Sequence, residues 1–84
     1  MDLTEIIERT KRDMAAITGL PPDTVSRLDP GEHGWTIGID MIEHKSIPRT
    51  QDLIASFEVL LGHDGKIQRW RRTGRFHRAQ GGEG

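Results

Sequence analysis

The sequence contains no cysteine and no tyrosine, and its aromatic side chains are two tryptophans and two phenylalanines. The absence of cysteine excludes disulfide frameworks, thiolate nucleophiles and zinc sites that require sulfur. The hydrophobic fraction of 33% and the aromatic fraction of 5% are low for a small domain that must bury its own core. We therefore expect a partner protein, or a second copy of the chain, to contribute to its stability.

Long apolar runs are also missing. No stretch approaches the about 18 apolar residues that a membrane-spanning helix requires. Residues 1–14 are amphipathic and charged, and they lack the basic segment followed by an apolar run that is typical of a secretion signal. We therefore expect a soluble protein of the cytoplasm with no membrane partner.

Charge is present in both signs but is unevenly distributed. The formal net charge is -1, yet residues 1–65 carry 12 acids and 6 bases, whereas residues 66–78 carry 6 bases and no acid. Glu83 is the remaining acid. This separation favours association with an acidic surface, or with the acidic part of another copy as a homodimer, which light scattering would detect.

The first segment has the period of an amphipathic helix. Its apolar positions recur at steps of three and four: Leu3, Ile6, Ile7, Thr10, Met14 and Ile17. Asp2 and Glu5 have the spacing of an N-terminal capping box, and Gly19 followed by Pro21 ends the segment. One narrow apolar stripe predicts a single packing partner for this helix.

After the helix the apolar period changes to two. The alternation predicts strands near residues 24–28, 35–43, 53–61 and 66–76, separated by turn-forming segments and a wide connection at 44–52. The predicted fold class is therefore α+β, with an N-terminal helix packed on a curved antiparallel sheet of three to four strands. We expect one domain over residues 1–78 and a flexible glycine-rich tail at 79–84.

The last two strands are predicted to form a hairpin. If Asp64 and Gly65 form a two-residue loop, paired residue numbers sum to 129. The inner pairs are Val59–Trp70, Phe57–Arg72, Ala55–Gly74 and Leu53–Phe76, and the outer pairs are Leu60–Arg69, Glu58–Arg71 and Ile54–Arg75. A three-residue loop would shift this register by one and turn Trp70 outward.

We prefer the two-residue loop because it buries both aromatic side chains of the last strand. Trp70 and Phe76 then join the core, so Trp70→Ala should lower the free energy of unfolding by about 3–5 kcal/mol. Arg69, Arg71 and Arg75 line the outer face around Glu58, and these four residues are the candidate partner-binding site. Arg72 remains on the inner face, where its side chain should reach out near the rim of the sheet.

Catalysis has little support in the sequence. His33, His44, His63 and His77 fall in turns or at strand ends and are more simply explained as solvated side chains. The pairing of nucleophile, base and orienting acid is absent, and the glycines punctuate turns instead of forming a phosphate-binding loop. We expect no enzymatic activity, no metal and no cofactor.

Nucleic-acid binding is the alternative function. Alternating arginine and aromatic side chains on a sheet can hold phosphates and stack on bases. The predicted register argues against it because it buries the aromatic residues on the face opposite the arginines. The acidic net charge is also unlike that of most nucleic-acid-binding modules.

Several motifs together resemble the gas vesicle protein O family. They are a Gly-Trp pair at Trp35, an Ile-Pro-x-Thr-x-Asp connection at Ile47, Pro48, Thr50 and Asp52, a strand with Phe57, Glu58 and Val59, an Asp-Gly turn at Asp64 and Gly65, and an arginine-rich last strand with Trp70. The resemblance covers residues 1–78 and is strongest from Gly34 onward. Phe57 stands where the family pattern has Tyr, and the sequence starts at the expected helix without the long polar extension common in the family.

The resemblance implies a function in the assembly of gas vesicles, the gas-filled protein shells that give cells buoyancy. The chain is too polar to form the shell wall, so the implied role is that of an accessory protein that binds other gas vesicle proteins. It would act in the cytoplasm or associated with the vesicle. The resemblance supplies no catalytic residue and implies structural roles for Trp35, Ile47, Pro48, Asp52, Phe57, Asp64, Gly65 and Trp70.

Overall fold

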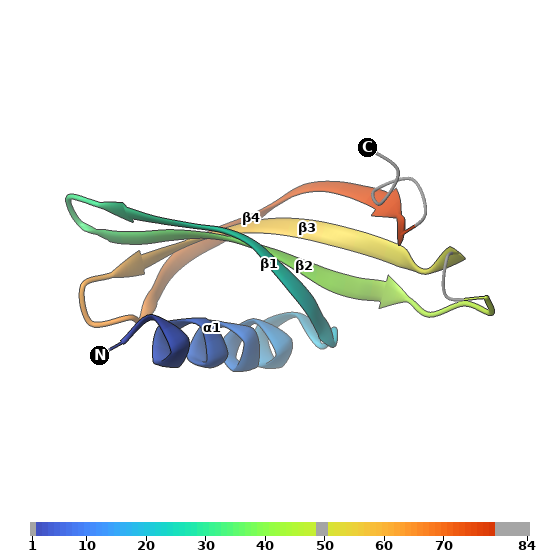
Figure 1. Ribbon diagram of the computed structural model, residues 1–84, viewed down its shortest axis with the longest axis horizontal. Helices are drawn as coiled ribbons and strands as arrows, with labels where there is room; N and C mark the ends of the chain where they lie inside the picture. Colours follow the sequence, from blue (N-terminus) through green and yellow to red (C-terminus); the bar gives the residue numbers. More distant parts are fainter. Residues whose placement is uncertain (1, 49–50, 79–84) are drawn as a thin grey trace.

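The computed structural model describes residues 2–48 and 51–78 and shows an α+β fold. Its elements are α1 (Leu3–Thr18), β1 (Pro22–Gly31), β2 (Gly34–His44), β3 (Leu53–Gly62) and β4 (Ile67–His77). The strands form one open sheet in the order β1-β2-β3-β4, and all neighbours are antiparallel. Helix α1 lies across one face of this sheet (Figure 1). The predicted fold class is confirmed, whereas the expected tail at 79–84 lies outside the described residues.

Helix α1 begins and ends at the predicted residues. The Asp2 carboxylate accepts a hydrogen bond from the Glu5 N–H at 2.9 Å, which satisfies one of the free donors of the first turn. At the other end, the Gly19 N–H donates to the Ala15 carbonyl at 2.8 Å. Local sequence signals thus define both ends of the helix.

The core lies between α1 and the facing side of the sheet, which we call the inner face. Its buried members are Ile6, Met14, Ile37, Ile39, Met41, Ala55, Phe57, Val59 and Leu61. Thr10 is also fully buried, and its hydroxyl donates to the Ile6 carbonyl at 2.8 Å. Leu3 and Ile17 remain 49% and 48% exposed, so the ends of the predicted apolar stripe extend past the core.

The β1–β2 turn explains the glycine of the Gly-Trp motif. Gly31 pairs with Gly34, and β1 therefore includes Asp29 and Pro30 and extends beyond the short strand that the sequence predicted. Gly34 has φ 141°, and a β-carbon there would collide with the backbone carbonyl oxygen of Leu61. A side chain at position 34 would therefore separate β2 from β3.

The β3–β4 turn differs from the prediction. The Gly62 N–H donates to the Lys66 carbonyl at 3.0 Å, and three residues lie between this pair. Gly65 has φ 81°, a left-handed conformation that suits the last position of a three-residue hairpin loop. The two-residue loop predicted from Asp64 and Gly65 is therefore wrong.

A β-bulge next to this turn restores the predicted pairing in the middle of the hairpin. Leu61 pairs with Ile67 but Leu60 pairs with Arg69, so Gln68 is an extra residue on β4. The predicted register, in which the numbers of paired residues sum to 129, then holds over four consecutive pairs. These are Leu60–Arg69, Val59–Trp70, Glu58–Arg71 and Phe57–Arg72. The longer loop and the bulge offset each other, so these four predicted pairs are confirmed.

A second bulge makes the remaining predicted pairs wrong. After Phe57–Arg72 the next pair is Ser56–Gly74, so Thr73 is the extra residue. Beyond it, Ala55 pairs with Arg75, Ile54 with Phe76, and Leu53 with His77. The bulge therefore moves Arg75 to the inner face and Phe76 to the opposite, outer face, the reverse of the prediction.

The predicted burial of Trp70 is also wrong, although its strand partner is the predicted one. Trp70 is 43% exposed. Its ring meets the Phe57 ring edge-on with centroids 5.7 Å apart, at the margin of the core. Among the described residues, Ile67 is the partly buried β4 residue that packs against the core. Helix α1 therefore leaves most of the inner face of β4 uncovered.

Candidate functional site

The candidate site lies on β4, which is an edge strand of the sheet and is exposed along most of its length. We define the outer arginine surface as Arg69, Arg71 and Glu58. The Arg71 Nε lies 3.1 Å from a carboxylate oxygen of Glu58, and Arg27 of β1 lies 3.6 Å from the other oxygen. Within residues 2–48 and 51–78, Arg69 makes no ion pair, so its charge is available to a partner.

Arg75, predicted to belong to this surface, lies instead in an inner cluster with Arg72 and Glu43. Arg72 approaches the Glu43 carboxylate at 2.9 Å, and Arg75 pairs with the same carboxylate. The Glu43 side chain is only 16% exposed, so two cations compensate a largely buried acid. Arg75 is thus paired within the fold.

A third group of charges joins the beginning and the end of the sheet. Arg78 reaches Asp52 at 3.1 Å and Asp23 at 3.3 Å. Asp52 is 2% exposed and also accepts the Ser46 N–H at 2.8 Å. The hydrogen bond to Asp52, reinforced by the nearby Asp23 charge, raises the pKa of Arg78 above its ordinary value although burial acts in the opposite direction. Arg78 therefore stays positively charged.

The residues for which the resemblance implied structural roles are spread over the fold. Trp35 packs against the core and Phe57 lies within it. Ile47 is fully exposed and Pro48 is exposed in the β2–β3 connection, where Thr50 lies outside the described residues. Asp64 lies in the β3–β4 turn and accepts the Lys66 N–H at 3.0 Å. Exposure of Ile47 gives this connection an apolar side chain that the core does not use.

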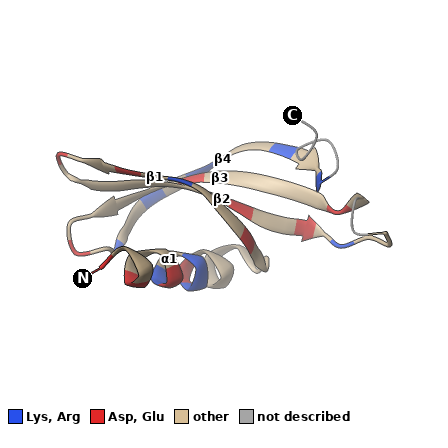
Figure 2. Ribbon diagram, viewed as in Figure 1, with Lys and Arg blue, Asp and Glu red and all other residues tan. Residues whose placement is uncertain are grey.

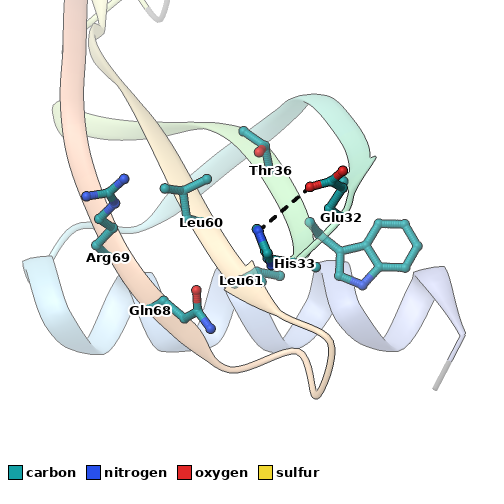
Figure 3. Close-up of a pocket in the computed structure, with 10 residues that line it drawn as sticks. Glu32, His33, Thr36, Leu60, Leu61, Gln68 and Arg69 are labelled. Carbon is teal, nitrogen blue, oxygen red and sulfur yellow. Dashed lines mark ion pairs between the residues drawn. The ribbon is translucent and has the colours of Figure 1, made fainter.

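A shallow hollow of about 360 Å³ lies beside the two hairpin turns (Figure 3). The dashed line in this view joins His33 to Glu32, and this 3.9 Å pair is almost fully solvent-exposed. His63, also exposed, contacts the Glu32 carbonyl oxygen at 2.8 Å through its Nε2 and so connects the two turns. These contacts are made by exposed side chains at the surface.

The other histidines are likewise exposed, and His77 contacts the Gln51 carbonyl oxygen at 3.2 Å through Nδ1. In the part of the chain that the structure describes, no group of three His, Asp or Glu side chains is arranged to hold a metal ion. Over the same residues, no helix has the length and apolar character needed to cross a membrane.

Sequence reasoning missed Glu43, Asp23 and Arg78 as charge partners. Glu43 continues the inner-face alternation after Met41, and an acid on an apolar face signals a nearby cation. That signal could have identified Glu43, but not its partner Arg75, whose face depends on the bulge at Thr73. Asp23 and Arg78 carried no comparable signal because they are 55 residues apart.

The comparisons with known proteins agree on one family. The model of the family described as gas vesicle synthesis protein GvpO matches residues 1–82. The chain is also 34% identical over 67 residues to gas vesicle protein O of Streptomyces sp. (strain CB03234), which covers 80% of this chain and 52% of that protein. The chain thus spans about half the length of this curated relative, and no solved structure matched it. Because the family model matches nearly the whole sequence, the chain belongs to the gas vesicle synthesis protein GvpO family.

Proposed function

We propose that this chain is a non-enzymatic accessory protein of gas vesicle assembly that binds other gas vesicle proteins while the shell nucleates or grows. Family membership supports a role in gas vesicle formation, and hence in buoyancy. Such a protein acts in the cytoplasm, free or associated with the growing vesicle. The homodimer expected from the charge separation stays a prediction.

The observation that carries this proposal is the exposed, incompletely neutralised outer arginine surface. The helix covers the inner face, which leaves Arg69 and Arg71 on the face that α1 does not cover. Figure 2 shows that basic residues recur along β4, whereas acidic residues lie on β1, β2 and β3 and in the turns. Glu58 neutralises part of the positive charge of the outer arginine surface. Arg69, which has no ion pair among the described residues, can attract an acidic surface on another protein.

Charge reversal at Arg69 should test this contact. We expect Arg69→Glu to abolish or strongly reduce vesicle formation in cells because it replaces attraction to an acidic partner by repulsion. The domain should stay folded, since Arg69 is exposed and has no ion pair among the described residues. Vesicle yield, measured by electron microscopy or buoyancy of cells, is the readout.

The matched control is Arg12→Glu, which makes the same charge change at an exposed position of α1. Circular dichroism should confirm that both variants are folded. Normal vesicle yield with Arg69→Glu, or an equal loss with both variants, would contradict a role for the outer arginine surface. Arg75 is unsuitable for this experiment because an acid there would face the largely buried Glu43.

Nucleic-acid binding remains a second candidate because Trp70 is more exposed than the sequence predicted. An exposed indole beside Arg72 could stack on a base while the arginine contacts a phosphate. Its neighbours limit this possibility, since Arg72 already pairs with the Glu43 carboxylate that it shares with Arg75, and the net charge is -1. One aromatic side chain is also a small stacking platform.

Titration with a labelled single-stranded oligonucleotide distinguishes the two functions. We expect weak binding at physiological salt that does not depend on Trp70. For a phosphate contact, affinity should fall steeply with salt, and the log-log slope should become shallower by about 1 when Arg69 is removed. Submicromolar binding that is lost in Trp70→Ala would favour the nucleic-acid function over assembly.

A further inference from the structure

We propose that β4 binds its partner by strand addition, taking an extended acidic segment of another protein as a fifth strand of the sheet. This inference rests on the proposed function and specifies the mode of binding and the chemistry of the partner. Strand β4 pairs with β3 on one side, and among the described residues no segment pairs with its other side. An edge strand of this kind presents backbone N–H and C=O groups that an extended peptide can satisfy.

The two edges of the sheet differ in their capacity to accept a strand. Strand β1 contains Pro22 and Pro30, which have no backbone N–H, and its register is interrupted near both Asp23 and Ser26. Strand β4 contains no proline, and residues 69–72 pair with β3 without interruption. The bulges at Gln68 and Thr73 delimit this regular segment. An incoming strand therefore has one short, well-defined stretch of edge to pair with.

The side chains of residues 69–72 determine which side chains the added strand should carry. On the inner face, the sheet row Ile37, Val59 and Trp70 would be continued by a side chain of the partner. That side chain would lie beside the exposed indole, near a hollow of about 380 Å³ that is bounded by Thr18, Leu20, Phe57 and Trp70 among others. An apolar residue suits this position because it covers the exposed part of Trp70.

Charge determines the flanking positions. On the outer face, the partner residue next to Arg69 would meet a guanidinium with no ion pair within residues 2–48 and 51–78. On the inner face, the partner residue next to Arg72 would meet a side chain that is 46% exposed. Acidic residues suit both positions. The predicted segment therefore has an apolar residue opposite Trp70 and acids opposite Arg69 and Arg72.

A second copy of this chain is a poor occupant of the same edge. A two-fold pairing of β4 with itself centred on Trp70 would place Arg69 of one copy opposite Arg71 of the other, at two places. Like charges directly opposite each other destabilise a sheet. The arginines thus oppose pairing of β4 with itself while favouring an acidic strand, so we expect no dimer formed by pairing of β4 with β4.

The test uses the intact chain and fluorescein-labelled synthetic peptides of about ten residues, the upper end of the usual range of strand lengths. The probe is built from valine and glutamate, with valine opposite Trp70 and glutamate opposite Arg69 and Arg72, so its two glutamates lie one residue to one side of that valine and two residues to the other. A control peptide carries lysine in place of glutamate. Fluorescence anisotropy should show saturable binding of the acidic peptide and, at equal salt, binding of the lysine peptide that is at least about tenfold weaker.

Backbone methylation separates strand addition from simple charge attraction. Alternate residues of an added strand direct their N–H groups toward β4, and the others direct them away. We expect N-methylation of one alternate set to weaken binding at least about tenfold and methylation of the other set to leave it within about twofold. Equal effects of the two sets would overturn strand addition, yet would leave the proposed function intact if Arg69→Glu still abolishes vesicle formation.

Variants of the protein complete the test. Arg69→Glu and Trp70→Ala should each weaken peptide binding, whereas Arg12→Glu should not. The proposal is wrong if no peptide binds and the Arg69→Gln/Arg71→Gln variant, which lacks both charges, aggregates. In that case the function of the two arginines is to prevent the edge of β4 from pairing with another copy. Normal vesicle formation in Arg69→Glu, together with binding of the acidic peptide by the unsubstituted chain and weaker binding by the variant, would reject the proposed function but not the strand-addition mode.

Discussion

Phe57→Ala should lower the free energy of unfolding by about 3–5 kcal/mol, the cost of removing a large aromatic side chain from a core. Phe57 is 3% exposed, and its ring contacts Trp70 edge-on and lies 5.6 Å from the Arg72 guanidinium. A small domain has a total stability of about 5–15 kcal/mol, so this loss should unfold a substantial fraction of the protein. Urea denaturation followed by circular dichroism measures it.

Trp70→Ala is the informative comparison because the sequence predicted a loss of about the same size there. With the indole 43% exposed, we now expect a loss of about 1–2 kcal/mol, made up of the aromatic contact and partial burial. Equal losses for the two variants would show that Trp70 is as buried as Phe57 in solution. The double variant should be non-additive because the two rings touch.

Asp52→Ala should lower the free energy of unfolding by about 3 kcal/mol, the lower end of the range for breaking a buried ion pair. The variant would leave the Ser46 N–H without its acceptor at 2.8 Å and remove the Asp52 carboxylate from Arg78. Arg78 is 28% exposed and keeps Asp23, which limits the loss. A lower midpoint in thermal and urea unfolding is the expected result.

Asp29→Ala is the matched control for Asp52→Ala. Its ion pair with Arg27 is short, at 2.6 Å, but both side chains are more than half exposed. Such surface pairs contribute about 0–1 kcal/mol. Similar midpoints for the two aspartate variants would show that burial of Asp52 adds nothing to the value of its ion pair.

Much of the fold could be predicted because its signals are local. The capping pair of Asp2 and Glu5 and the stop at Gly19 define α1, and the alternation of apolar residues defines β2 and β3. The four central hairpin pairs were also predicted correctly, but for an incorrect reason. The loop is one residue longer than expected, and the bulge at Gln68 compensates for it.

The candidate site was harder to predict because β-bulges leave no clear mark on the sequence. Polar residues such as Gln68 and Thr73 fit a regular strand and a bulge equally well, yet the bulge at Thr73 decides which face receives Arg75 and Phe76. The exposure of Trp70 has a different cause. The alternation of residues along the strand placed Trp70 correctly on the inner face. How far α1 covers that face depends on tertiary packing, which cannot be read from the alternation.

The link from Arg78 to Asp23 and Asp52 has a consequence for the order of folding. It connects residues 55 positions apart, so it can form only after nearly all of the sheet has been synthesised. Helix α1 and the hairpin of β1 and β2 involve short sequence separations and can form earlier, while contacts of long separation form slowly because they close large loops. We therefore expect the chain to form its helix early in folding and the link of Arg78 to Asp23 and Asp52 late.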